Sequence, residues 1–275
     1  MKTFLALCRL VRPLQVFALG YYFFARTVFL LFRLRLFRGL YLTFGDIVVF
    51  LRPDFPSGLR LIQEIYADDI YGNFLTGPDP IVLLDVGANI GLVSLKMCHE
   101  RADSCAYCIE PHPGTFSLLQ TNIAANQLSD RIFPFQYAAS EVAGTISISV
   151  SENSNMAKTQ DSPGGAIDKC IEVPSVQIDG FCSKNAVRPN VMKIDVEGHE
   201  LAVLKGSQST LDHVQKIIVE CHSEDLLSAC KDILRMHGFF LSTEGGLLFG
   251  QKSKKTMQPG TGQGTTSAPQ EASLG

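Results

Sequence analysis

The sequence has no excess of basic residues. Its 24 lysines and arginines stand against 27 aspartates and glutamates, which gives a formal net charge of −3 at pH 7. No stretch alternates aromatic with basic residues. A protein that binds DNA or RNA usually carries clustered basic residues, because it must neutralise phosphate groups. The sequence therefore predicts no nucleic-acid partner.

The sequence also lacks the regular cysteine framework of small secreted proteins. Its eight cysteines are spread over 275 residues and lie mostly inside apolar stretches, so we expect free thiols and a reducing compartment. Cys105 and Cys108 form one C-x-x-C pair, with Cys98, His99 and His112 nearby, but no second pair has matching spacing. A zinc site there is the weaker alternative to buried thiols, and no metal ligand set is predicted.

The N-terminal segment, residues 1–44, is apolar and basic but has no A-x-A site typical of a cleaved signal peptide. Between Leu14 and Phe32 the only charged residue is Arg26, and basic residues lie on both sides of this run. The run is long enough to span a bilayer, and it also suits a helix lying at the membrane interface. We expect membrane association with the rest of the chain in the cytoplasm. Helices packed on a soluble cytoplasmic domain are the alternative.

Composition divides the chain into three regions. The apolar segment at 1–44 is followed by one α/β domain at 45–250. The tail at 251–275 is rich in Gly, Thr, Ser, Pro and Gln and has no apolar periodicity, so we expect it to be disordered. No internal repeat is present.

The stretch IVLLDVGANIG, from Ile81 to Gly91, is the centre of the predicted domain. Its four leading apolar residues predict a strand buried on both faces, and Asp85 ends that strand. Gly87 and Gly91 then frame a tight turn into an apolar-periodic helix. Such a turn lets a ligand approach the backbone, and the helix N-terminus offers free N–H groups. The spacing D-x-G-x-x-x-G differs from the G-x-G-x-x-G of dinucleotide enzymes, and an ordinary strand-to-helix turn stays open.

Strands and helices alternate over the rest of the domain, which predicts a mostly parallel sheet with helices on both faces. The expected strands are 45–51, 81–84, 104–109, 132–137, 144–150, 173–178, 191–194 and 216–221. The expected helices are 59–66, 90–101, 113–126, one through about residue 205, and 225–237. Residues 151–169 are expected to form a long loop, and 239–249 a closing hairpin.

Acidic residues gather at the predicted carboxyl ends of the strands, where open α/β sheets bind ligands. These strand ends hold Asp85, Glu110, Ala138–Ser140, Asp195–Glu197 and Glu220–His222. The predicted rim of the site is therefore strongly acidic.

Glu110 lies at the end of the second strand of the alternating region, where an acid accepts hydrogen bonds from ribose hydroxyls. A solvated strand end is the alternative for this residue. A nucleoside at this place could belong to NAD or to S-adenosylmethionine. The acids Asp85, Asp195 and Glu197 favour the second ligand, because its sulfonium is positively charged, and no group suited to hydride transfer stands out.

Five segments taken together resemble the FkbM family of methyltransferases, over roughly Asp46–His222. They are LLDVGANIG, IEPHPGTFSLLQTNIAANQL, VQIDGF, VMKIDVEGHELAVLKG and IIVECH. The resemblance implies a class I methyltransferase (Rossmann-like) fold and S-adenosylmethionine as methyl donor. It also implies O-methylation of hydroxyls, often on sugars or other secondary metabolites.

The resemblance carries functional residues over by motif match. The implied cofactor residues are Asp85, Gly87, Asn89, Gly91 and Glu110, and the acids facing cofactor and substrate are Asp195 and Glu197. Ala139 is added as a cofactor residue from its place at a strand end.

Methyl transfer from a sulfonium requires in-line alignment, and a sugar hydroxyl benefits from a general base. Asp195 is the first candidate for that base, followed by Glu197 and then His222. Glu197 could instead cap a helix, His199 is expected to be solvated, and Lys193 is expected to pair with a buried carboxylate.

The sequence thus predicts an S-adenosylmethionine-dependent O-methyltransferase for a sugar, glycan or glycolipid. Its expected partners are a hydroxyl-bearing small molecule or glycan and a membrane surface contacted by residues 1–40. A nicotinamide oxidoreductase and a membrane-anchored binding protein without catalysis are the alternatives. The acceptor and the oligomeric state stay open.

Overall fold

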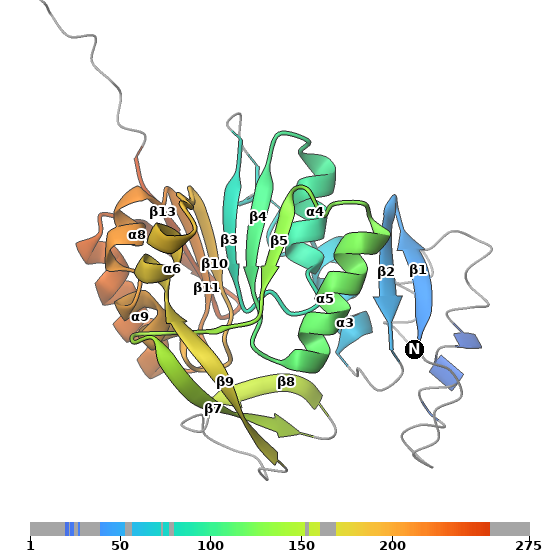
Figure 1. Cartoon of the computed structure of the whole chain (residues 1–275). Coiled ribbons are helices and arrows are strands. Elements are labelled where there is room, and N and C mark those ends of the chain that lie inside the picture. The colour runs from blue at the N-terminus through green and yellow to red at the C-terminus, as the bar shows by residue number, and fades with distance from the viewer. Residues whose placement is uncertain are drawn as a thin grey trace, which may run out of the picture.

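A seven-stranded sheet forms the centre of the domain (Figure 1). The computed structural model describes residues 20–21, 23–24, 27, 39–52, 57–72, 74–76, 80–151, 154–159 and 169–253. The strand order is β12-β13-β11-β10-β3-β4-β5, and the strands are β3 (Val82–Val86), β4 (Cys105–Ile109), β5 (Ile132–Phe135), β10 (Val191–Ile194), β11 (Lys216–Glu220), β12 (Phe240–Glu244) and β13 (Leu247–Gln251). Only β13 runs antiparallel to the other strands, so the predicted mostly parallel sheet is confirmed.

Helices cover both faces of this sheet, as predicted (Figure 1). Side chains alternate along β3, so Leu83 and Leu84 enter two separate hydrophobic cores. The core around Leu83 is closed by α3 (Gly58–Ile62), its π-helical extension η2 (Gln63–Ala67), α4 (Leu92–Glu100) and α5 (Pro113–Ala125). The core around Leu84 is closed by α6 (Ile178–Lys184), α7 (Glu200–Lys205), α8 (Gln208–His213) and α9 (Glu224–Met236).

A hairpin of β1 (Leu40–Phe44) and β2 (Ile47–Leu51) packs beside α5 where the sequence predicted one strand. Its turn contains Gly45, whose φ of 60° is adopted without strain only by glycine. Two side chains of α5 bind the backbone of β2: Asn122 accepts from the N–H of Phe50 at 2.7 Å, and Asn126 accepts from that of Val48 at 2.8 Å. The hairpin thereby joins the core around Leu83, ahead of the domain start expected at residue 45.

A second, four-stranded sheet lies beyond the carboxyl ends of the parallel strands (Figure 1, bottom). Its order is β6-β9-β7-β8, with β6 (Ala138–Ser140), β7 (Gly144–Ser151), β8 (Ser154–Thr159) and β9 (Lys169–Gln177). The expectation of a continuous loop over 151–169 is wrong at 154–159. Those polar residues form β8 because they pair with β7, a contact that hydrophobic periodicity does not reveal.

Asp179 caps a different helix from the one in which it lies. Helix α6 begins after Gln177, without a side-chain cap. The carboxylate of Asp179 instead accepts from the N–H groups of Ser209 and Thr210, at 2.9 and 2.8 Å, in the first turn of α8. It therefore fastens α6 to α8 on one face of the sheet.

The predictions for the two ends of the chain fall largely outside the described residues. The apolar run from Leu14 to Phe32, with Arg26, lies there almost entirely, and so do residues 254–275 of the tail. Membrane association and a disordered tail stay predictions. Among the residues that the structure does describe, no helix is long and apolar enough to cross a bilayer.

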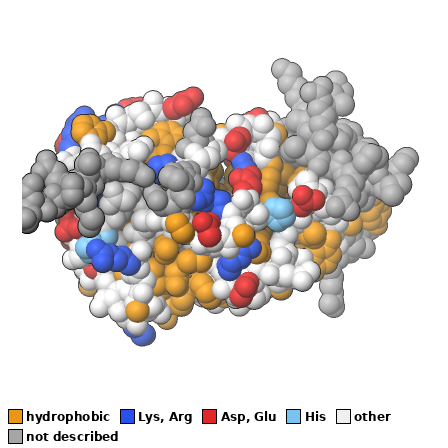
Figure 2. All heavy atoms as spheres, turned by 90° about the horizontal axis from the view of Figure 1, so that it is seen from above, with side chains coloured by type: hydrophobic (Ala, Val, Ile, Leu, Met, Phe, Trp, Pro, Cys, Tyr) orange, Lys and Arg blue, Asp and Glu red, His pale blue; other side chains and the backbone are white. Residues whose placement is uncertain are grey.

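Charges of both signs are mixed on the surface seen from above in Figure 2. On the part of that face that the structure describes, basic and acidic side chains alternate with apolar ones, and no broad basic patch forms. This mixture matches the near-neutral net charge of the sequence.

Candidate active site

A pocket of about 870 Å³ opens at the carboxyl ends of β3, β4, β10 and β11. The chain builds β3, β4 and β5 in one direction from the centre and then returns to place β10 on the other side of β3. The site thus lies at the point where strand order reverses, where open α/β sheets bind their ligands. The second sheet closes one side with Ile146 and Ile148 of β7.

The glycine turn after β3 packs directly against the backbone that follows β10. Gly87 has a φ of 76°, and a Cβ on it would lie 1.8 Å from the carbonyl oxygen of Asp195. No side chain fits there, so this position requires glycine for its dihedral and for the close approach. The contact joins the two motifs, DVGANIG and KIDVEG, into one site.

The N–H groups of this turn are already hydrogen-bonded inside the protein. Gly87 and Ala88 donate to the carbonyl of Ile109, Asn89 to Glu110 Oε2, Ile90 to the side chain of Asn89, and Gly91 to the carbonyl of Ala88, all at 2.9–3.0 Å. The sequence led us to expect free N–H groups at the N-terminus of the following helix, which is a separate set. The turn itself has no N–H group left to donate to a bound pyrophosphate.

Glu110 lines the pocket just after β4 and is 6% exposed. Its Oε1 accepts from the N–H of His112 at 2.9 Å and its Oε2 from that of Asn89 at 3.0 Å. Burial raises the pKa of Glu110 to about 7, although these two hydrogen bonds oppose the rise. Each oxygen can accept a second hydrogen bond, which suits the predicted ribose contact.

Two of the predicted cofactor residues lie behind the pocket wall. Asp85 is fully buried, accepts from the hydroxyl of Ser94 at 2.7 Å and is not among the residues that line the pocket. Gly91 is also behind the wall, where a Cβ would lie 2.5 Å from a methyl group of Leu119. Both residues shape the turn from beneath, whereas Gly87, Asn89, Glu110 and Ala139 line the pocket.

Lys193 connects the glycine turn to the acids of the site. Its side chain is 5% exposed, and its Nζ donates to the carbonyl of Gly87 at 2.8 Å. The same atom lies 3.5 Å from Asp85 Oδ1 and 3.4 Å from Asp195 Oδ2, so the expected pairing with a buried carboxylate is confirmed. Burial alone would lower the pKa of Lys193, but Asp195 and Asp85 raise it, so the group stays charged.

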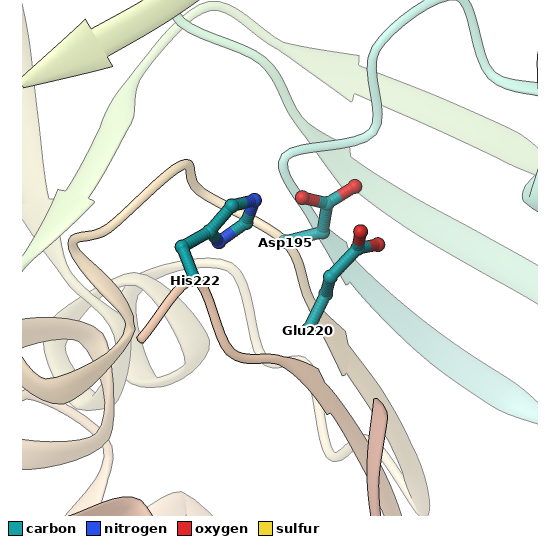
Figure 3. A group of neighbouring side chains, drawn as sticks. All are labelled: Asp195, Glu220 and His222. Atoms are coloured by element: carbon teal, nitrogen blue, oxygen red, sulfur yellow. The ribbon is translucent and has the colours of Figure 1, made fainter. Parts of the chain in front are cut away.

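Asp195, Glu220 and His222 form a cluster at the ends of β10 and β11 (Figure 3). One ligand-type atom of each lies within 4.8 Å of the others, and Figure 3 shows the three side chains directed toward a shared space. These atoms could hold a divalent cation. Burial, as the larger cause, and repulsion by Asp195 raise the pKa of Glu220 to about 7. The sequence placed Glu220 on the rim but gave it no role.

His222 is held by two carboxylates. Its Nδ1 lies 2.9 Å from Oε1 of the fully buried Glu200, and its Nε2 lies 3.5 Å from Oε2 of Glu197. The hydrogen bond with Glu200 raises the pKa of His222 to about 9, although burial opposes it. The imidazole is therefore positively charged at neutral pH, which makes it a poor proton acceptor there.

Glu197 lies inside the pocket wall and adopts a left-handed backbone with a φ of 53°. Helix α7 begins only after His199, so the alternative of Glu197 as its cap is not supported. His199 was expected to be solvated, but it lines the pocket and its Nε2 is 3.0 Å from Ser140 Oγ. That contact joins β6 of the second sheet to the start of α7, and it could not be read from sequence spacing.

The C-x-x-C pair does not build a zinc site. Three residues apart in β4, Cys105 and Cys108 point to opposite faces of the strand. All seven cysteines in the described residues are free, including buried Cys98 and Cys108, as the reading of free thiols predicted. Within those residues the only grouping suited to a metal is the cluster of Asp195, Glu220 and His222.

The sequence model of the protein family called Methyltransferase FkbM domain matches residues 85–241, which is more than half of the chain. The chain belongs to the FkbM methyltransferase family. Its mostly parallel sheet agrees with the class I methyltransferase fold that the sequence predicted. The match favours a methyltransferase over a nicotinamide oxidoreductase.

Two curated relatives of this chain are methyltransferases. Hexuronic acid methyltransferase AglP of Haloferax volcanii is 35% identical over 143 residues, which cover 52% of this chain and 56% of AglP. The 2-O-methyltransferase NoeI of Sinorhizobium fredii is 26% identical over 62% of this chain and 72% of its own length. A solved FkbM methyltransferase from Methylobacillus flagellatus is 19% identical, with a TM-score of 0.49 over 71% of this chain and 52% of its own. The match thus spans little more than half of AglP.

Replacing Glu110 with alanine should weaken S-adenosylmethionine binding by about 1–3 kcal/mol, because ribose hydroxyls lose their acceptor. In the native protein, affinity should also fall as the pH drops below about 7, since protonation removes the negative charge of Glu110. Calorimetry between pH 5.5 and 8.5 measures both effects. Glu110→Gln should bind weakly with a flatter pH dependence, and native affinity in the alanine variant would remove Glu110 from the cofactor site.

Proposed function

We propose that this enzyme transfers the methyl group of S-adenosylmethionine to a hydroxyl of a sugar, glycan or glycolipid. The observation that carries the proposal is the group of carboxylates, Asp195, Glu197 and Glu220, that lines the pocket beside the cofactor turn. Carboxylates accept hydrogen bonds from hydroxyls, and several of them suit an acceptor with several hydroxyls. AglP is a hexuronic acid methyltransferase and NoeI is a 2-O-methyltransferase, which supports O-methylation of a sugar.

The pocket divides into two sides with different tasks. On the cofactor side, Gly87 and Asn89 form the turn, Glu110 accepts from the ribose, and Ala139 leaves room for the cofactor. On the other side, Asp195 lies where the turn and the acid cluster meet, so its charge faces both the sulfonium and the acceptor. The donor supplies an activated methyl group, and the chain's own work is to align the acceptor oxygen with it.

Asp195→Asn should lower S-adenosylmethionine affinity and turnover together, because the change removes a negative charge but keeps the shape. We expect an affinity loss of about 1–3 kcal/mol, the range for a hydrogen bond to a charged group. Calorimetry gives the affinity, and release of S-adenosylhomocysteine gives turnover. A variant with native affinity and a 10²–10⁴-fold lower turnover would instead assign Asp195 the role of general base.

The proposal is tested with acceptors of one chemical class at a time. Methyl glycosides of glucose and of glucuronic acid, N-acetylglucosamine, and a simple catechol are incubated with the full chain and labelled S-adenosylmethionine. Transfer to a sugar hydroxyl, located by mass spectrometry and NMR of the product, is the expected result. Transfer only to the catechol, or only to a nitrogen or carbon of any probe, would overturn the proposal.

A further inference from the structure

Glu220 differs from the other acidic and basic side chains of the cluster in having no partner. Asp195 lies 3.4 Å from Lys193, Glu197 lies 3.5 Å from His222, and His222 lies 2.9 Å from Glu200. The side chain of Glu220 lines the pocket but makes no hydrogen bond or ion pair with any other residue in the described part of the chain. Its carboxylate is therefore available to a bound acceptor.

The backbone under Glu220 is rigid. It ends β11, which pairs with β10 on one side and with β13 on the other, where Glu220 stands opposite Leu247. A side chain on a strand held from both sides is positioned more precisely than one on a loop. Figure 3 shows its carboxylate entering the same space as that of Asp195.

We propose that Glu220 is the group that takes the proton from the acceptor hydroxyl. This inference rests on the proposed function. A lone pair of the acceptor oxygen forms the new C–O bond, the S–CH₃ bond breaks with its electron pair left on sulfur, and the hydroxyl proton moves to the Glu220 carboxylate. The products are a methyl ether, neutral S-adenosylhomocysteine and protonated Glu220, which then returns its proton to solvent.

Charged groups of both signs surround the Glu220 carboxylate. Lys193 and His222 attract it, whereas Asp195 and Glu197 repel it. A carboxylate that lines the pocket without an ion-pair partner can accept the proton of a bound hydroxyl. The remaining charged or titratable groups that act on this carboxylate come from other elements and are Arg60 and Tyr71.

The kinetic test compares Glu220→Gln with the native enzyme on the sugar probe that is methylated fastest. We expect kcat to fall 10²–10⁴-fold and the Kd for S-adenosylmethionine, measured by calorimetry, to change less than about threefold. The native kcat should rise with pH through about 7, and the variant should lose this rise. Glu220→Asp should restore part of the rate, and Glu224→Gln, on the exposed first turn of α9, is the matched control that should behave as native.

A measurement without turnover checks the ionisation directly. In protein labelled with ¹³C at the glutamate carboxyls, two signals should titrate near pH 7, those of Glu110 and Glu220. Glu220→Gln should remove one of them and leave the other. The signal that disappears in Glu220→Gln belongs to Glu220. If that signal does not titrate between pH 6 and 8 in the native protein, Glu220 is not suited to act as a base.

The outcomes separate this inference from the proposed function. If the native enzyme methylates none of the sugar hydroxyls, both the proposed function and the role of Glu220 are overturned. If the native enzyme methylates a sugar and Glu220→Gln has the same rate and pH dependence, only the role of Glu220 is overturned. Native turnover that is abolished by EDTA and restored by Mg²⁺ would overturn the role of Glu220 as a free base.

Discussion

Gly87→Ala should abolish measurable S-adenosylmethionine binding. The added Cβ would lie 1.8 Å from the carbonyl oxygen of Asp195, and that obstacle is backbone, which cannot rotate away. The φ of 76° adds a further cost of about 1–2 kcal/mol for a residue with a side chain. The turn after β3 must therefore separate from the backbone after β10, and the two motifs that form the cofactor side no longer meet. Calorimetry should show at least a 100-fold loss of affinity.

Gly180→Ala is the control for this experiment. Gly180 lies in α6, where a new Cβ would have no heavy atom within 4 Å, so binding should stay native. Circular dichroism and thermal unfolding of both variants separate a local loss of the site from a loss of the fold. A Gly87→Ala protein that binds S-adenosylmethionine as tightly as the native one would show that the turn moves freely against Asp195.

The central strand, its glycine turn and the parallel sheet could be predicted because each depends on local pattern. Four consecutive apolar residues before Asp85 require a strand buried on both faces, and the alternation with helices requires parallel neighbours. Pairing of polar strands is different. β8 is recognisable only from its partner β7, and β1 only from its partner β2.

The candidate site was predicted in its location more fully than in its roles. The ends of β4 and β10 could be read from sequence, and Glu110 and Asp195, which follow them, line the pocket. By contrast, β3 does not end at Asp85 as expected but continues to Val86. Which side of a strand end a carboxylate occupies depends on packing, and Asp85 turned out to be buried beneath the turn. The charge of His222 could not be predicted either, because its partner Glu200 lies 22 residues away and on another element.

Lys193→Met should destabilise the protein by about 3–5 kcal/mol, the cost of breaking a buried ion pair from one side. The methionine removes the ammonium group that lies 3.5 Å from the fully buried Asp85, and it leaves the carbonyl of Gly87 without its 2.8 Å hydrogen bond. Such a loss is a large part of the total stability of a typical domain. Urea unfolding at pH 7 measures it as a lower midpoint at constant slope.

Two comparisons decide whether this loss comes from the buried charges. Lys205→Met removes a lysine that is 49% exposed and 3.7 Å from Glu141, so it should cost less than about 1 kcal/mol. Adding Asp85→Asn to Lys193→Met should recover part of the lost stability, because the double variant no longer buries an unpaired carboxylate. The pKa of Lys193 is raised in the folded state, so its contribution should be complete below the unfolded pKa of about 10.4 and unchanged between pH 6 and 9. A loss below about 1 kcal/mol for Lys193→Met, or no recovery in the double variant, would show that Lys193 does not hold Asp85 and the glycine turn together.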